Sequence, residues 1–428
     1  MARVRELLVD FNPWWKESFR VEGYRDREVY GSLGPFLRQP QIVALTGLRR
    51  TGKTTILHRL VEDAIAEGRD PKDILYFSFD EFREVPLREV LREYEAATGK
   101  TLRSGRFLVL LDEVQKLEGW ADQLKALYDA HKGRVKFVAS GSESLFLRKG
   151  SKETLAGRLF EFRVDPLSFR EYLAFKGVKH EPVSLHEREL VRAFDAFVLT
   201  QGFPELVEVT ERAVVRKYLR ESIVEKVVFR DLPGLLDIRD VSLLESVVNL
   251  LMEEPGQIIQ VSELAGTLAV SRDTLSNYLA YLEQSFLMRK LYNYSTGRRK
   301  VERKLRRYYP TIVSPDLAFR GDDLSRSRVF EWAIVGQLRA EFFWRDAYKN
   351  EVDVVLPARK PVPVEVEYGK VETGGVEAFL RKFGVKAGYV VTRDQEEERA
   401  VGGGRIRIVP ACRFLLEGLP AKDRKGAG

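Results

Sequence analysis

The residues Gly47-Leu-Arg-Arg-Thr-Gly-Lys-Thr54 match the pattern G-x-x-x-x-G-K-[ST], in which a glycine-containing loop wraps phosphate groups. The loop follows an apolar run at 41–46 that is typical of a short buried strand. It precedes a pattern at 53–67 whose apolar positions recur at helical spacing. A chance match in an ordinary loop would have neither flank, so the order strand, loop, helix favours a phosphate-binding loop.

Each part of this loop has a chemical role toward a nucleotide. The glycines let consecutive backbone N–H groups turn toward the phosphates, and the N-terminus of the following helix adds its dipole. Lys53 would place a cation near the β- and γ-phosphates and assist catalysis, and the hydroxyl of Thr54 can ligate magnesium. We therefore expect ATP and Mg²⁺ as cofactors, with nucleotide contacts from Gly47, Arg50, Thr51, Gly52, Lys53, Thr54 and Thr55.

A second apolar run, at 107–111, ends in the acid pair Asp112-Glu113. Ligands bind at the carboxyl ends of strands in parallel sheets, so the pair would lie beside the phosphates. We expect Asp112 to hold the magnesium ion through water and Glu113 to polarise the attacking water as general base. An apolar strand that ends in an acidic turn is common by itself, but its spacing after the phosphate loop favours the catalytic interpretation.

Strand-like runs at 74–79, 107–111 and 135–139 follow the first strand and alternate with helical stretches. This alternation predicts an α/β fold of the P-loop NTPase kind, with a parallel sheet wrapped by helices. The pattern is then helical to about 236, and helix and strand alternate again from about 315. The predicted domains are a P-loop core at 1–167, a helical lid at 168–239, a winged helix at 240–314, an α/β domain at 315–417 and a disordered tail at 418–428.

The phosphate loop, the acid pair and the strand that ends in Ala139-Ser-Gly-Ser142 together resemble the AAA+ ATPases. The later segments look like those of archaeal and bacterial ATPases that carry a winged helix and a nuclease-like domain after this core. The resemblance therefore covers nearly the whole chain. It implies that a polar residue after the fourth strand, Ser140 or Ser142, orients the water at the γ-phosphate. A Ser-Gly-Ser loop is otherwise an ordinary turn.

The resemblance also extends to Leu155-Ala-Gly-Arg158 and the run at 165–172. It implies an arginine finger, a guanidinium that stabilises charge developing in the transition state, commonly from a neighbouring subunit. Arg158 is the candidate, although Arg148 and Arg163 could compete for the role. A finger that acts in trans would require a homo-oligomer. The alternative is an arginine in a surface ion pair.

A helix-turn-helix pattern covers 259–279, with Ser262 and Ser271 as the expected N-caps of its two helices. A basic segment at 298–304 would form the tip of a hairpin, as in a winged helix. Cations at such a tip would bind the phosphates of DNA, or of RNA, with little sequence preference. Winged helices in ATPases also serve as packing modules. The expected DNA contacts are Arg272, Asn277, Arg298, Arg299, Lys300, Arg303 and Lys304.

The C-terminal pattern resembles the PD-(D/E)XK nuclease fold, a restriction-endonuclease-like α/β domain. On that resemblance Glu331, Asp353 and Glu365 match the acidic positions, whereas the lysine position holds Glu367. Four carboxylates could draw a divalent cation, but Glu367 cannot neutralise an attacked phosphate as an ammonium would. The alternatives are a degenerate domain used for binding or assembly, and carboxylates satisfied by local Arg and Lys.

The composition of the 428 residues limits the class of protein further. An apolar fraction of 44% beside 32% charged residues fits a folded globule, and no apolar run is long enough to span a bilayer. We therefore expect a cytoplasmic protein with no membrane partner, and the net charge of +7 mildly favours a polyanion. The leading function is an ATPase coupled to DNA handling. The alternatives are a nucleotide-gated regulatory switch acting through protein contacts, and an ATP-licensed metal-dependent nuclease.

Overall fold

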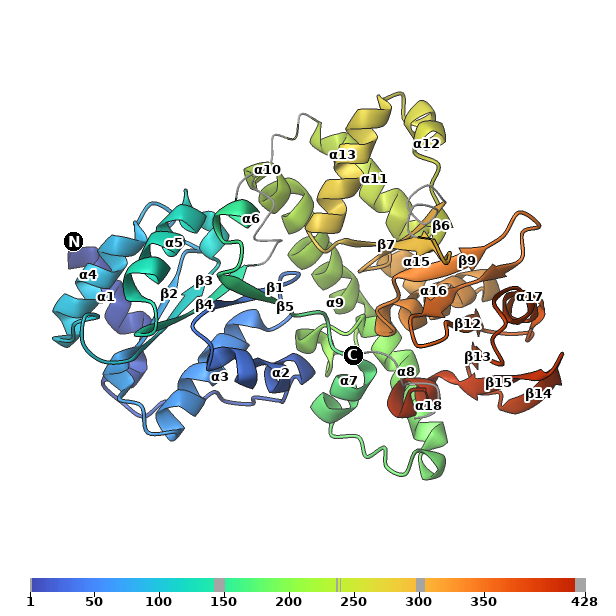
Figure 1. Ribbon diagram of the computed structural model, residues 1–428, viewed down its shortest axis with the longest axis horizontal. Coiled ribbons are helices and arrows are strands. Elements are labelled where there is room, and N and C mark those ends of the chain that lie inside the picture. The colour runs from blue at the N-terminus through green and yellow to red at the C-terminus, as the bar shows by residue number, and fades with distance from the viewer. Residues whose placement is uncertain (1, 142–150, 236–237, 239, 298–304, 420–428) are drawn as a thin grey trace. The chain divides into compact units, whose positions relative to one another are not determined.

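The computed structural model describes residues 2–141, 151–235, 238, 240–297 and 305–419 (Figure 1). The chain forms two compact units. The first comprises Met1–Pro166 with Gly234–Asp237, and the second comprises Leu167–Pro233 with Ile238–Gly428. The first break falls one residue before the predicted end of the P-loop core. The three predicted domains that follow belong mostly to the second unit, and their division from one another stays a prediction.

A five-stranded parallel sheet forms the centre of the first unit, which confirms the predicted α/β fold. Four strands agree with the predicted runs within two residues, and their buried residues suit a sheet covered on both faces. The fifth is partly exposed and contains Glu161 and Arg163, so its pattern does not predict a strand. The order is β2 (Ile74–Ser78), β3 (Phe107–Asp112), β4 (Val135–Gly141), β1 (Ile42–Thr46) and β5 (Leu159–Arg163).

Helices cover both faces of this sheet. Along β1, Val43 and Leu45 pack with α2 (Glu28–Leu37) and α3 (Lys53–Ala66). The alternate residues Ile42 and Ala44 face the other side, because neighbouring strand residues point to opposite faces. That side holds α1 (Ala2–Phe11), α4 (Leu87–Thr98) and α5 (Trp120–His131). Shorter helices complete the unit: η1 (Pro13–Trp15), η2 (Pro71–Asp73), η3 (Val114–Lys116) and α6 (Ser151–Thr154).

The chain from 169 to 235 is helical, as its pattern predicts. Ser168 starts this stretch with a capping box, in which its hydroxyl accepts from the N–H of Glu171 at 3.1 Å and the Glu171 carboxylate accepts from the N–H of Ser168 at 2.8 Å. The helices are α7 (Phe169–Lys176), η4 (Val183–Leu185), α8 (Glu187–Thr200), η5 (Pro204–Leu206), α9 (Arg212–Lys217), η6 (Tyr218–Val224), η7 (Val227–Asp231) and α10 (Leu232–Leu235).

One sheet of the second unit crosses the predicted boundary at 314. Its β7 pairs antiparallel with β8 and parallel with β9, where Tyr292 lies opposite Phe342. The strands are β10 (Glu351–Val352), β9 (Phe342–Arg345), β7 (Met288–Asn293), β8 (Arg306–Pro310) and β6 (Gln257–Ile258), in that order. The helices beside them in sequence are α11 (Val241–Glu253), α12 (Val261–Thr267), α13 (Arg272–Gln284) and α15 (Pro315–Ala318).

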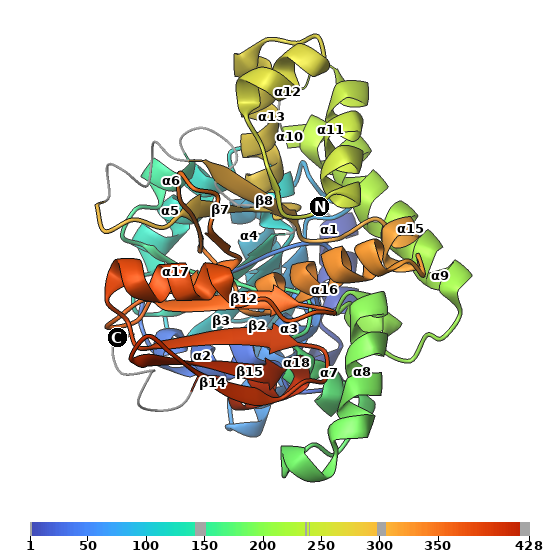
Figure 2. The ribbon, with the colours of Figure 1, turned by 90° about the vertical axis from the view of Figure 1, so that its right-hand side faces the viewer.

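The other sheet of the second unit lies between two layers of helices (Figure 2). Its order is β11 (Val354–Leu356), β12 (Val362–Glu367), β13 (Ala387–Thr392), β15 (Gly404–Pro410) and β14 (Glu397–Val401). Apolar residues of α17 (Gly374–Phe383) cover one face. The other face shares a core with α16 (Asp323–Gln337), α18 (Ala411–Glu417), α7 and α8. This core joins residues from Leu167 to Leu416, which explains why the segments form one unit.

No helix within the described ranges is long and apolar enough to cross a membrane.

Candidate functional site

The phosphate loop lies between the end of β1 and the start of α3, where the motif requires it. Gly47 has a φ of +144° and Gly52 a φ of +94°, a region that favours glycine. A Cβ at Gly47 would lie 2.3 Å from the carbonyl oxygen of Val164, much closer than real side chains approach. Position 47 therefore requires glycine, because the chain leaving β5 passes directly beside it.

Lys53 is buried and held by its own loop. Its Nζ donates hydrogen bonds to the carbonyl oxygens of Gly47 at 3.1 Å and Leu48 at 2.8 Å. These bonds keep the ammonium at the loop, where the motif places phosphate. The hydroxyl of Thr51 is also turned inward and donates to Leu48 at 2.9 Å, so this side chain shapes the loop. Three predicted nucleotide contacts lie at exposed positions: Arg50, Thr54 and Thr55.

Asp112 is the centre of a hydrogen-bonded group of oxygens at the carboxyl edge of the sheet. Its Oδ2 accepts from Thr54 Oγ1 at 2.8 Å and from the hydroxyl of Tyr76 at 2.9 Å. Its Oδ1 accepts from Ser140 Oγ. Burial and the nearby Asp112 carboxylate raise the pKa of Tyr76, so this hydroxyl stays a proton donor. Side chains from α3, β2, β3 and β4 thus meet at one carboxylate.

Glu113 follows directly and has a φ of +53°, a left-handed conformation that is uncommon for a residue with a side chain. Such local strain is frequent at functional sites. Its backbone N–H donates to Ser140 Oγ at 3.3 Å, so Ser140 contacts both acidic residues. Its carboxylate accepts from Gln115 Nε2 at 2.8 Å and lies 3.9 Å from Lys116 Nζ. The site therefore contains the predicted acid pair, and Ser140 links its two members.

Two residues of the site carry no sequence signal. Arg27, which is buried, donates from its two terminal nitrogens to the carbonyl oxygens of Thr51 at 2.5 Å and Asp165 at 2.8 Å. It ties the phosphate loop to the chain after β5, although it lies 24 residues before Thr51. Tyr76 reaches Asp112 from the neighbouring strand. A single sequence shows neither contact, because both join segments that only the fold brings together.

The candidate arginine finger is paired within its own chain. Arg158 Nε lies 3.1 Å from Oδ1 of Asp129 on α5, which is the alternative that the sequence left open. Arg163, the competitor, pairs with Asp165 at 2.5 Å. Arg148 and Ser142 lie outside the described residues. The role of Arg158 as a finger stays a prediction.

Acidic residues beside the C-terminal sheet converge, and Arg307, on β8 of the other sheet, lies among them. Arg307 Nη1 is 2.9 Å from Oδ1 of Asp353 and 3.3 Å from Oε1 of Glu331, while Nη2 pairs with Glu351. Burial alone would lower the pKa of Arg307, but Tyr309, Asp353 and Glu331 raise it. The guanidinium thus supplies positive charge beside carboxylates that could also draw a divalent cation, which is the alternative of a local arginine partner.

Three carboxylates of this cluster have raised pKa values, so they bind protons more readily than an ordinary glutamate. Burial and the Asp353 charge raise the pKa of Glu331 to about 7 and that of Glu367 to about 7. The same two causes raise the pKa of Glu365 well above its usual value, and its buried Oε2 has no hydrogen-bond partner among the described residues. Within those residues, no group of three or more Asp, Glu, His or Cys is arranged to hold a metal ion.

The helix-turn-helix segment consists of α12 and α13. Ser271 caps α13 by accepting from the N–H of Thr274 at 3.0 Å, as predicted. Ser262 is not a cap, because α12 already begins at Val261. The predicted DNA contacts Arg272 and Asn277 are exposed on α13. The other five, Arg298, Arg299, Lys300, Arg303 and Lys304, lie outside the described residues.

The parallel sheet, the phosphate loop and the acid pair define a P-loop nucleotide-binding domain. The family model described as an AAA domain matches residues 39–173, which include the five strands of the sheet, the phosphate loop and the acid pair. A second model, described as a domain of unknown function, matches residues 191–311. The AAA-type domain in the first unit is therefore supported by both geometry and family likeness.

Two relatives, both named as uncharacterized proteins, match most or part of the chain. An uncharacterized protein of Methanocaldococcus jannaschii is 26% identical over 417 residues, covering 88% of this chain and 85% of its own. An uncharacterized protein of Haemophilus influenzae is 27% identical over 264 residues, covering 59% of this chain and 62% of its own. A crystal structure of Cdc6p from Pyrobaculum aerophilum covers 75% of this chain and 97% of its own at 12% identity. Its TM-score is 0.31, at which the likeness carries no weight for this chain.

Proposed function

We propose that the chain is an ATPase whose first unit binds and hydrolyses Mg-ATP and whose second unit couples this reaction to DNA handling. One observation carries the ATPase part: Thr54, on the phosphate loop's helix, is hydrogen-bonded to Asp112, beside Glu113. Hydroxyl and carboxylate oxygens are the ligands magnesium prefers. When bound, magnesium neutralises phosphate charge.

The residues of the site have separable roles in this proposal. The ammonium of Lys53 and the loop N–H groups bind the phosphates, and Thr54 and Asp112 hold the metal. Glu113 accepts the proton of the attacking water. Ser140 contacts Asp112 and the N–H of Glu113, so it positions both acids.

Magnesium-dependent ATP hydrolysis tests this part. Glu113→Gln keeps the shape of the side chain but removes the base, so turnover should fall at least about a hundredfold while ATP still binds. Glu118→Gln is a matched control, because Glu118 is exposed and lies outside the hydrogen-bonded group. Equal loss in both variants, or no loss in Glu113→Gln, would remove Glu113 from the reaction.

The DNA part rests on the exposed polar face of α13, which begins with Arg272, and on the net charge of +7. Duplex DNA should raise the hydrolysis rate, and the effect should shrink between about 50 and 200 mM salt as phosphate contacts weaken. Arg272→Ala should reduce the stimulation, whereas Arg381→Ala, at an exposed position on α17, should not. Hydrolysis that no DNA changes would end the coupling proposal.

A nucleotide-gated switch is the second candidate, and the surroundings of Glu113 favour it. Gln115 donates to the Glu113 carboxylate, and Lys116 lies nearby. Both groups compete with water for the carboxylate, which would keep turnover slow while ATP is bound. Gln115→Ala should then raise the hydrolysis rate several-fold. A rate that stays equal or falls would favour the simple ATPase.

Nuclease activity has less support. Arg307 offsets the charge of Glu331 and Asp353. Glu367 occupies the lysine position of the PD-(D/E)XK fold, which this domain resembles. We therefore infer that the C-terminal sheet serves binding or assembly. Magnesium-dependent strand scission that Asp353→Ala abolishes would overturn this inference.

A further inference from the structure

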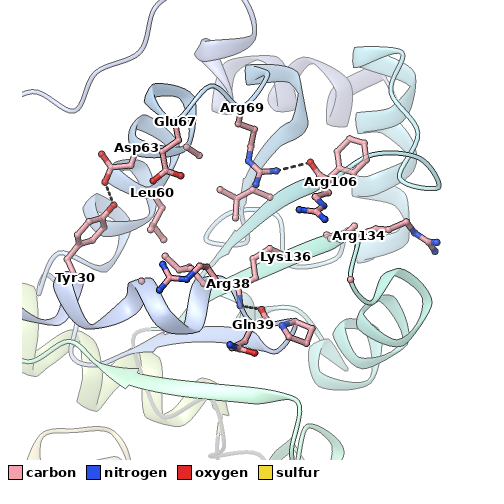
Figure 3. A pocket seen from close by; sticks show the side chains of 18 of the residues that line it. Tyr30, Arg38, Gln39, Leu60, Asp63, Glu67, Arg69, Arg106, Arg134 and Lys136 are labelled. Atoms are coloured by element: carbon pink, nitrogen blue, oxygen red, sulfur yellow. Dashed lines mark hydrogen bonds between the residues drawn. The ribbon is translucent and has the colours of Figure 1, made fainter.

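The first unit contains a pocket with several charged side chains in its lining, at the sheet edge opposite the phosphate loop (Figure 3). It has a volume of about 940 Å³ and is lined by the ends of α2 and α3 and by the starts of β3 and β4. Asp112 ends β3, whereas the pocket is lined by its first residue, Phe107. Five strand residues span about 17 Å, so a molecule in the phosphate loop does not fill this pocket.

The pocket carries an excess of positive charge on one side. Five cationic and two anionic side chains line it, a surplus of three charges: Arg38, Arg69, Arg106, Arg134 and Lys136 against Asp63 and Glu67. Asp63 is already paired with Arg59 and accepts from the hydroxyl of Tyr30. Asp63 therefore offsets little of the positive charge of the five cationic side chains.

Three of the five cations are engaged by the protein itself. Lys136 Nζ donates to the carbonyl oxygens of Phe36 at 2.8 Å and Gln39 at 2.9 Å, which closes the end of α2, and burial lowers its pKa to about 8. Arg69 donates to the carbonyl oxygen of Arg106 at 2.7 Å, and Arg134 donates to that of Ala130 at 3.1 Å. These hydrogen bonds explain the positions of Lys136, Arg69 and Arg134, and no bound ligand is needed to explain them.

Arg38 and Arg106 have no such partner. Their guanidinium groups make no hydrogen bond or ion pair with any residue in the described part of the chain. Figure 3 shows the guanidinium of Arg106 pointing into the pocket, with Arg38 on the α2 side, whereas Arg134 points away. Both side chains line the pocket, and a guanidinium group binds phosphate through paired N–H donors.

The opposite wall of the pocket favours hydrogen-bond donors. Glu67, directly after α3, makes no side-chain hydrogen bond or ion pair with a described residue. A ligand that was anionic throughout, such as a nucleic-acid backbone, would meet repulsion here.

We propose that this pocket binds a phosphorylated small molecule that also carries hydroxyl or amino groups, the class to which nucleotides belong. The phosphate lies against Arg38 and Arg106, and the hydroxyl or amino groups lie toward Glu67. This site is separate from the phosphate loop and does not depend on the ATPase proposal.

Equilibrium dialysis of the full chain with radiolabelled ADP tests the proposal, because ADP carries both kinds of group. The wild type should bind two ADP molecules per chain, and Lys53→Ala should weaken only one of the two sites. Arg38→Gln with Arg106→Gln should weaken the other at least about tenfold, which is the effect of losing charge-assisted hydrogen bonds. Both arginines are exposed, so these changes leave no internal cavity.

Arg134→Gln is the matched control, because it removes one equally exposed guanidinium at the pocket rim that points away. It should change the second affinity less than about twofold, and thermal melting should show that all variants fold. Inorganic pyrophosphate should displace ADP from the second site. Loss of all ADP binding in Lys53→Ala, a remaining site that tolerates the double change, or no competition by pyrophosphate at that site would each overturn the proposal. DNA binding that the double change weakens, with ADP binding intact, would assign the pocket to nucleic acid instead.

Discussion

The hydroxyl of Thr54 donates a hydrogen bond to Oδ2 of Asp112 at 2.8 Å, although the two residues lie 58 positions apart. The fold explains the contact. Thr54 is in the first turn of α3, which follows β1, and Asp112 is the last residue of β3. Parallel strands end at the same edge of a sheet, so both oxygens are directed to one point. The two predicted magnesium ligands are therefore brought together by the fold itself.

Two substitutions of Thr54 separate the hydroxyl from the shape of the side chain. Thr54→Val keeps the shape and removes the oxygen, so the magnesium concentration for half-maximal ATP hydrolysis should rise about tenfold or more. Thr54→Ser keeps the oxygen and should stay within about threefold of the wild type. Magnesium titrations of the hydrolysis rate measure both. The same midpoint for valine and serine would show that the hydroxyl is not used.

Gly47 provides a test of how tightly the phosphate loop is built. An added Cβ would meet the Val164 carbonyl oxygen at 2.3 Å, and the φ of +144° is unfavourable for alanine. Gly47→Ala should therefore lower the free energy of unfolding by about 3 kcal/mol or more. Gly68→Ala is the control, since its φ is +90° but nothing lies within 4 Å, so it should cost about 1 kcal/mol. Urea unfolding compares the two, and equal losses would show that the Val164 contact has no effect.

The parts of the site that the sequence predicts are those encoded by short segments. The phosphate loop and the acid pair are each recognised within a few residues. Arg27 has no such signal, because it contacts Thr51 and Asp165 only after the chain has folded back. The edge strand β5 escapes prediction for a similar reason. Its Glu161 and Arg163 interrupt the apolar run that reveals the central strands.

The C-terminal cluster shows a different limit of sequence reasoning. Alternation correctly places Glu365 and Glu367 on one strand, β12, and the family pattern brings Glu331 and Asp353 near them. The sequence offers only local Arg and Lys in general as counter-charges. Arg307 comes near them through the parallel pairing of β7 with β9, which joins the predicted hairpin to the C-terminal segment and has no signal in the sequence. Sequence therefore predicts the acids better than their partner.

Arg158 allows a test of cooperation between subunits. It pairs with Asp129 in its own chain, so a finger in trans would require this pair to open. Chains with Arg158→Ala and chains with Glu113→Gln should each be inactive, but a mixture should recover part of the hydrolysis rate, because some interfaces then contain both intact residues. Recovery should depend on protein concentration. A mixture no more active than its components, or full activity of Arg158→Ala alone, would leave Arg158 as a surface ion pair.

The free energy of unfolding should depend on pH through the acidic cluster around Arg307. The pKa of Glu331 and that of Glu367 are raised to about 7 in the folded chain, chiefly by burial. The unfolded chain releases these protons near the ordinary glutamate pKa of about 4.3. The folded state therefore holds more protons between about pH 4 and 7, and the stability from these groups is lost as pH rises through 7.

Glu365→Gln isolates this effect, because Glu365 has a raised pKa and an unpartnered buried Oε2. An amide carries no charge at any pH, so the variant avoids the cost of a buried carboxylate. Its stability advantage over the wild type should therefore shrink as the pH falls from 8 to 5, because the raised pKa of Glu365 favours the protonated carboxyl at the lower pH. Urea unfolding at the two pH values measures this, with Glu254→Gln, at an exposed position, as the control. An equal gain in the free energy of unfolding at pH 5 and pH 8 would mean that the charge of Glu365 does not cause the difference between the variant and the wild type.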